Sequence, residues 1–186
     1  NKYKFENKYF ESTESLKEKI LNKTVIPHQV EFQPGPQGKK ICWLSCPYCY
    51  GESATNSEER PSTERLVEIL NEIADGGVNK VTFAGWATDP LNSKSIDDLL
   101  ETAIKRKMIF GFNTKPIKVS DRFVSLLKDN EINPDSWISL SIDSGSNDVF
   151  NKVHGMETKA ALYDRVLINV NRIKEANYPE RKFDVS

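Results

Sequence analysis

The chain has 186 residues, enough for one domain with a substantial core, and its 26 basic and 27 acidic side chains give a net charge of −1. Because no dense basic run is present, the sequence lacks the electrostatic footprint of a nucleic-acid-binding protein. No apolar stretch approaches the roughly 20 residues that cross a bilayer, and the polar, aromatic N-terminus does not resemble a signal peptide. We therefore expect neither nucleic acid nor a membrane among the partners.

Two features of the sequence concern the length of the whole protein and the cellular compartment in which it lies. There is no initiator methionine, and residues 183–186 alternate as if a strand were beginning, so we expect a piece of a longer protein. All three cysteines lie within eight residues and have no partner elsewhere. Free, clustered thiols are typical of a reducing compartment, which predicts a cytoplasmic protein.

The hydrophobic pattern predicts alternating strands and helices. A capping box of Ser15 and Glu18 is expected to open a short helix through Leu21. Strands are expected at residues 29–33, 80–83, 108–112 and 137–143, with a fifth beginning at Phe183. Helices are expected from Pro61-Ser62 to Gly76-Gly77, over residues 96–104, after Ser120, between Gly145 and His154, and over about 160–176.

This rhythm of strand, loop and helix predicts a parallel sheet of the (β/α) barrel kind. In such barrels, the loops after the strands form the active site. The cysteines, the segment Gly85–Pro90, Asn113 and Asp143 all fall at those positions. The sequence therefore predicts that they meet at one end of the sheet.

The cysteines Cys42, Cys46 and Cys49 have the spacing C-x3-C-x2-C. Three thiolates so close together cannot all pair as disulfides, but they can converge on one soft metal centre. Three protein ligands leave a position open on a tetrahedral metal or on a [4Fe–4S] cube. The pattern thus predicts a reactive metal site.

With Tyr48 just before the third cysteine, this loop resembles the signature of the radical S-adenosylmethionine (radical SAM) superfamily. The resemblance covers about residues 28–186 and leaves residues 1–27 as an N-terminal extension. It implies an α/β fold, a partial (β/α) barrel with parallel strands that stops after about four and a half units. It also implies a [4Fe–4S] cluster held by the three cysteines, with SAM chelating the fourth iron.

The activity that the resemblance implies is reductive cleavage of SAM to a 5′-deoxyadenosyl radical, which abstracts hydrogen from a substrate. The electron would come from a reductant such as flavodoxin or ferredoxin. The resemblance slightly favours a peptide or natural-product intermediate as the substrate, with other small molecules open. It assigns no catalytic side chain in this sequence.

The resemblance also implies SAM contacts. Tyr48 occupies the position that faces adenine. The family's Gly-Gly-Glu-Pro motif, which holds the amino group of SAM, corresponds to Ala84-Gly85, two or three extra residues, and Asp89-Pro90. Either the Asp89 carboxylate or a backbone carbonyl near Gly85 could make that contact.

Further contacts are expected from the next two strands. Asn113-Thr114-Lys115 resembles the family's Thr-Asn-Gly strand ending. Ser139, Ser141 and Asp143 share parity on the fourth strand, so we expect them on one inward face. Ser141 best matches a ribose or carboxylate contact, whereas the adenine motif of strands five and six lies beyond or barely within this chain.

Several simpler interpretations remain open. The cysteines could form a non-catalytic zinc site with His28 or His154 as the fourth ligand. The chain could also be a degenerate family member that no longer binds SAM. Tyr48 could be loop packing, Asp89-Pro90 an ordinary turn, and Asp143 a helix cap. His154-Gly155 could be no more than a helix C-terminus.

Overall fold

The computed structural model describes residues 12–34, 42, 44–49, 61–85, 88–157, 160–177, 179–180 and 182–186. The first 11 residues of the predicted extension lie outside the described residues, as do two of the residues inserted between Gly85 and Asp89.

A five-stranded sheet forms the centre of the domain, and its order is β1-β2-β3-β4-β5. All four neighbouring pairs are parallel. The strands are β1 (Val30–Phe32), β2 (Lys80–Phe83), β3 (Ile109–Thr114), β4 (Trp137–Leu140) and β5 (Asp184–Val185). Because each strand pairs with the next one in the chain, the sheet is an arc of the predicted (β/α) barrel.

The fourth strand is shorter than predicted, since β4 ends at Leu140 and not at Asp143. Its partner β3 ends at Thr114, which is paired with Leu140. Beyond that pair, the Ser141 N–H donates one more bond to the Thr114 carbonyl, at 2.8 Å. Ser141 and Asp143 therefore lie in the loop after the strand.

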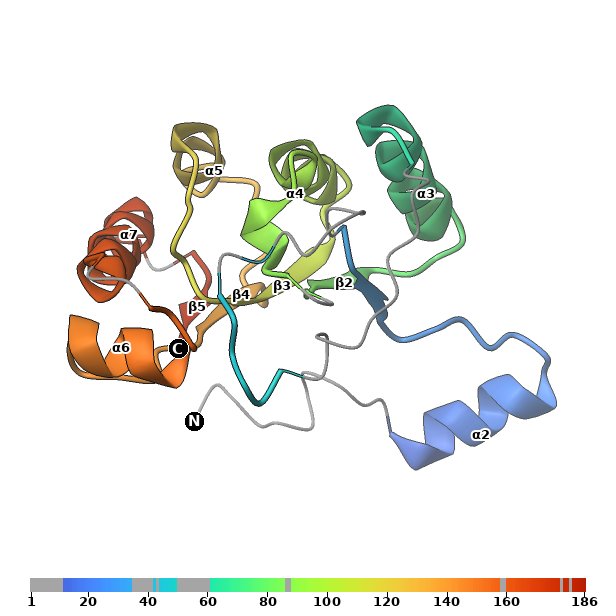
Figure 1. Cartoon of the computed structure of the whole chain (residues 1–186). Helices are drawn as coiled ribbons and strands as arrows, with labels where there is room; N and C mark the ends of the chain where they lie inside the picture. The colour runs from blue at the N-terminus through green and yellow to red at the C-terminus, as the bar shows by residue number, and fades with distance from the viewer. Residues whose placement is uncertain are drawn as a thin grey trace.

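Helices cover one face of the sheet, as Figure 1 shows. These are α3 (Thr63–Asp75), α4 (Ile96–Lys105), α5 (Asp121–Leu126) and α7 (Leu162–Ala176). The short α6 (Asn147–Val153) packs beside α7, and a 3-10 turn, η2 (Pro90–Asn92), precedes α4. The first helix, α2 (Thr13–Leu21), stands apart from this layer and has no buried residue.

Serine side chains cap most of these helices. Ser62, Ser120 and Ser146 each accept a bond from a backbone N–H in the first turn of α3, α5 and α6. The predicted capping box at Ser15 is wrong, because Ser12 caps α2 and accepts from the Ser15 N–H at 3.2 Å. Ser12 has the extended backbone that a cap needs, whereas Ser15 already lies inside the helix.

The hydrophobic core lies between the sheet and this helix layer. Phe83 and Phe112 stack with ring centroids 4.9 Å apart, and Phe123 of α5 meets Phe112 edge-on. Leu99 and Leu100 of α4 are fully buried against them. Packing of this kind fixes the register of the strands and therefore the positions of their carboxyl ends.

The other face of the sheet carries a row of four residues in register, Glu31, Thr82, Gly111 and Trp137. Glu31 pairs with Thr82, Thr82 with Gly111, and Gly111 with Trp137. A Cβ on Gly111 would lie 2.3 Å from the Trp137 ring. The ring therefore covers the glycine, and Trp137 is a packing residue of the barrel interior.

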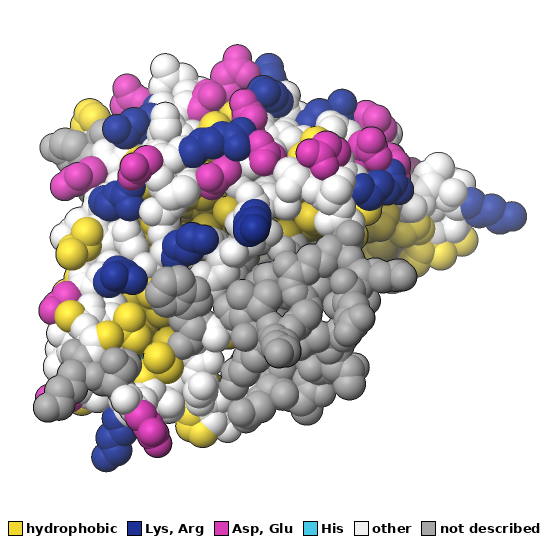
Figure 2. Space-filling model, turned by 45° about the horizontal axis from the view of Figure 1, so that its top comes forward, with side chains coloured by type: hydrophobic (Ala, Val, Ile, Leu, Met, Phe, Trp, Pro, Cys, Tyr) yellow, Lys and Arg dark blue, Asp and Glu magenta, His cyan; other side chains and the backbone are white. Residues whose placement is uncertain are grey.

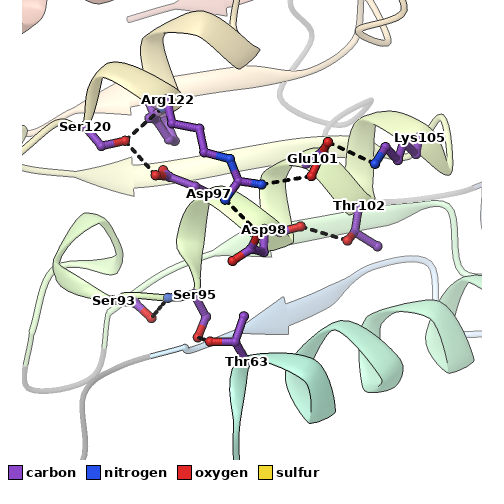
Figure 3. A network of polar contacts seen from close by, with 11 residues as sticks. Thr63, Ser93, Ser95, Asp97, Asp98, Glu101, Thr102, Lys105, Ser120 and Arg122 are labelled. Carbon is purple, nitrogen blue, oxygen red and sulfur yellow. Dashed lines mark hydrogen bonds and ion pairs between the residues drawn. The ribbon is translucent and has the colours of Figure 1, made fainter.

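A polar network ties the helix layer together near the amino ends of α3, α4 and α5 (Figure 3). The Thr63 and Ser95 hydroxyls lie 2.7 Å apart, and the Ser120 hydroxyl donates to Asp97 at 2.7 Å. Arg122 forms ion pairs with two acidic residues of α4, Asp98 and Glu101. Because each helix follows a strand, this network stabilises the end of the domain where the loops lie.

The surface is mixed in charge. Figure 2 shows acidic and basic side chains interspersed over the helix-covered face, without a large patch of either sign. Among the described residues, no helix is both long and apolar enough to span a bilayer.

Candidate active site

A cleft of about 430 Å³ opens at the carboxyl ends of the strands. Its lining comes from the cysteine loop after β1, from the segments after β2 and β3, and from Ser141 after β4. The sequence-predicted residues that line it are Cys42, Cys46, Cys49, Tyr48, Gly85, Asp89, Asn113 and Ser141. Ser139 and Asp143 are not part of the lining.

All three cysteines are free thiols that line this cleft. Burial raises the pKa of Cys42, and the charges of Cys46, Asp89 and Cys49 raise it further. The Cys49 N–H donates to the Cys46 carbonyl at 3.0 Å, which closes a tight turn between the two. Among the described residues, no three His, Cys, Asp or Glu side chains are gathered closely enough to hold a metal ion.

The turn that follows α6 holds the cysteine loop in place. The Ser45 N–H donates to the His154 carbonyl at 3.0 Å. Gly155 has φ +62°, and a Cβ on it would lie 2.3 Å from the Ser45 carbonyl oxygen. His154 is the C-cap of α6, as the simpler interpretation of this pair proposed. The backbone of His154 and Gly155 also packs against Ser45 of the cysteine loop, and this close contact requires a glycine at position 155.

A chain of polar contacts links the cysteine loop to the end of β3. Lys115 Nζ lies 2.5 Å from Asp143 Oδ2, and the Tyr48 hydroxyl donates to the same oxygen at 3.3 Å. The Tyr48 oxygen is also 3.0 Å from His154 Nδ1, and that nitrogen is 3.1 Å from Cys46 Sγ. Asp143 is therefore not the cap of α6, which is Ser146.

These contacts shift several pKa values. Burial alone would raise the pKa of Asp143, but the hydrogen bond and charge of Lys115 hold it below its usual range. Burial lowers the pKa of His154, and Lys115 lowers it further. Burial raises the pKa of Tyr48, and the nearby Cys46 and Asp143 add to the rise.

Asp89 fastens the segment after β2 to the end of β3. One oxygen accepts from the Leu91 N–H at 2.9 Å and from the Thr114 hydroxyl at 2.7 Å, and the other accepts from the Lys115 N–H at 2.6 Å. Burial raises the pKa of Asp89 to about 6, against these three hydrogen bonds, which favour the carboxylate.

Gly85 is required by the same fold of the chain. A Cβ on Gly85 would lie 1.7 Å from the Thr88 carbonyl oxygen, so no larger residue fits. Gly85 also lines the cleft. Asp89 and Gly85 therefore both shape the segment after β2 that borders the cleft.

The two histidines lie in different places. His28 Nε2 is 3.0 Å from Lys80 Nζ, at the amino ends of β1 and β2 and therefore opposite the cleft. His154 is fully buried next to Cys46. Only His154 therefore borders the cysteines.

The sequence-based prediction included Thr114 and Lys115 in the strand ending Asn113-Thr114-Lys115 but named only Asn113 as a site residue. Both line the cleft, and both contact Asp89. Their positions directly after Asn113, at the carboxyl end of a strand, were the signal that could have identified them.

Comparison with known proteins establishes the family. A sequence profile described as Radical SAM superfamily matches residues 39–185. The chain therefore belongs to the radical SAM superfamily, as its cysteine spacing predicted.

Two curated relatives carry the name S-adenosylmethionine-dependent nucleotide dehydratase. The one from Lacinutrix mariniflava is 34% identical over 109 residues, 55% of this chain and 21% of that protein. The one from Flammeovirga pacifica is 30% identical over 145 residues, 74% of this chain and 47% of that protein. The chain thus spans at most about half the length of these relatives.

The fold is shared with a solved structure, Streptococcus suis SuiB bound to its precursor peptide SuiA. The TM-score is 0.65 at 17% identity, covering 92% of this chain and 35% of that one. The likeness confirms the partial barrel.

The superfamily implies a [4Fe–4S] cluster and SAM, and the donor set here fits them. Three thiols with no disulfide partner face the same cleft. Each cysteine of such a cluster binds a different iron, so the thiols do not need to converge on one point as they would around zinc. Polar groups for a second ligand, those of Asn113 and Ser141, line the same cleft.

Proposed function

We propose that this chain is the core of a radical SAM enzyme in which Cys42, Cys46 and Cys49 hold a [4Fe–4S] cluster. The observation that carries the proposal is that these three thiols share one cleft with the carboxyl ends of the parallel strands. When bound, the cluster supplies the electron that cleaves SAM to a 5′-deoxyadenosyl radical for hydrogen abstraction from the substrate.

The protein's own residues bind and orient SAM. The backbone near Gly85 receives the amino group, and Asp89 keeps that segment in place through its bonds to β3. Among the described lining residues, Lys115 is the only cation, which suits the SAM carboxylate. Asn113 and Ser141 offer polar atoms to the ribose.

The remaining predicted contacts act at the edges of this site. More than half of Tyr48 is exposed, so its ring offers a face to adenine while its hydroxyl is held by Asp143. Asp143 acts through Lys115, to which it is paired. Ser139 lies beside Asn113 on the neighbouring strand, because the two are paired in register, and supports it from there.

For the substrate, we place nucleotides ahead of peptides. Both curated relatives described above are named for action on nucleotides, and they share about a third of the aligned residues with this chain. The peptide or natural-product substrate favoured by the sequence resemblance has only the fold-level likeness to SuiB on its side. A screen for hydrogen abstraction from both classes distinguishes them.

We further propose a cytoplasmic enzyme that is reduced by a flavodoxin or a ferredoxin. Cys49 is exposed, and Cys42 and Cys46 are partly exposed, so an electron donor can approach the cluster from outside. A test is single-turnover reduction of the reconstituted cluster by each donor.

The activity test is anaerobic reconstitution with iron and sulfide, followed by dithionite, SAM and quantification of 5′-deoxyadenosine. We expect release from the wild-type chain and from Ser45→Ala, whose loop contacts are made by its backbone. Cys46→Ala should release none. One tightly held zinc per chain and no cluster would overturn the function, and an intact cluster without cleavage would identify a degenerate member.

A further inference from the structure

His154 is a buried side chain that contacts the cysteine loop. It is 0% exposed at the end of α6, and its Nδ1 lies 3.1 Å from Cys46 Sγ. Its carbonyl also accepts the Ser45 N–H, so backbone and side chain both contact the loop. The same Nδ1 lies 3.0 Å from the Tyr48 oxygen, whose own proton is donated to Asp143, so this nitrogen faces two atoms of the loop that can both accept a hydrogen bond.

The other nitrogen of His154 makes no hydrogen bond to any described residue at this position. Among the described residues, His154 Nε2 is buried without a hydrogen-bond partner, and it lies 3.6 Å from Asp143 Oδ2. The ring packs edge-on against Phe150, with centroids 4.2 Å apart. A phenyl ring would fill the same space without an unpaired buried nitrogen, which costs stability. A packing role alone therefore does not account for a histidine here.

The donor chemistry assigns a role to Nδ1. A thiolate bound to iron carries no proton and only accepts hydrogen bonds, so the nitrogen that faces it must be the donor. A hydrogen bond to a ligating sulfur stabilises the reduced cluster, which carries one more negative charge, and thereby raises its reduction potential.

We propose that His154 is a positioning residue that donates a hydrogen bond from Nδ1 to the Cys46 sulfur and raises the reduction potential of the cluster. The inference rests on the proposed function, because it requires the cluster at Cys42, Cys46 and Cys49. The hydrogen-bond donor to the cluster ligand thus comes from the end of α6 and not from the cysteine loop itself.

Three variants test the proposal by redox titration of the reconstituted protein, followed by EPR. His154→Phe keeps the ring and removes the donor, whereas His154→Asn keeps a nitrogen near the place of Nδ1. His28→Asn is the control, since His28 lies at the opposite end of the sheet. We expect a lower midpoint potential for His154→Phe, and potentials near the wild-type value for the other two, at equal iron content.

A second measurement uses the wild-type protein and does not depend on how a variant folds. With 15N-labelled histidine, pulsed EPR of the reduced cluster should detect one coupled nitrogen, retained in His28→Asn. An uncoupled cluster, or an unchanged midpoint potential in His154→Phe at full iron content, would overturn the role of His154. Failure of the wild-type chain to assemble a cluster would instead overturn the proposed function.

Discussion

Replacing Gly155 by alanine tests how the cysteine loop is held. Gly155 has φ +62°, a conformation that costs a non-glycine residue about 1–2 kcal/mol. The new Cβ would also lie 2.3 Å from the Ser45 carbonyl oxygen. That oxygen belongs to the backbone, so the contact is relieved only by moving the loop, and overpacking of this kind costs about 1–3 kcal/mol.

We therefore expect Gly155→Ala to lower the free energy of unfolding by roughly 2–5 kcal/mol, the sum of these two effects. Because Cys46 follows Ser45, the same movement should reduce the iron bound per chain. Urea denaturation measures the first effect, and iron analysis after anaerobic reconstitution measures the second.

Gly145→Ala is the matched control, since a Cβ there would meet nothing within 4 Å. It should leave both quantities close to the wild-type values. If Gly155→Ala matched Gly145→Ala in both free energy of unfolding and iron bound per chain, the turn after α6 would not hold the cysteine loop in place.

Three further substitutions test other parts of the structure. Asp89→Asn places an amide N–H₂ among three donors, so we expect the free energy of unfolding in urea to fall by about 2–3 kcal/mol. We also expect weaker binding of SAM to the reconstituted protein, and an unchanged SAM affinity would contradict the role proposed for Asp89. Leu99→Ala creates a cavity in the core and should cost about 2–5 kcal/mol, whereas Leu21→Ala, at an 82% exposed position, should cost under about 0.5 kcal/mol. Arg122→Ala removes two half-exposed ion pairs and should cost about 1 kcal/mol or less, a difference that shrinks with added salt; a salt-independent loss would point to packing instead.

The sequence predicted the elements well because periodicity and end signals agreed. β2 was predicted with its observed bounds, and Ser120 was recognised as the cap of α5. The errors lie at the start of α2 and at the end of β4, where the sequence offers two possible boundaries. Ser12 and Ser15 both could cap α2, and the alternation through Asp143 continues past the point where β3 offers a partner to β4.

The site was predictable in part for the same reason. Residues at the carboxyl ends of strands, such as Asn113 near the end of β3, reach the cleft because parallel strands share one carboxyl edge. The contact between His154 and Cys46 joins residues 108 positions apart, and no local pattern specifies it. The pairing of Lys115 with Asp143 likewise depends on how two loops fold against each other.

The most direct test of the account is EPR of the reconstituted, reduced protein with and without SAM. The account predicts about four irons per chain and a cluster signal that changes when SAM is added, because three cysteines leave one iron open. Cys42→Ala, Cys46→Ala and Cys49→Ala should each lose the signal. A cluster signal that SAM leaves unchanged, or full iron retained after any of these substitutions, would contradict it.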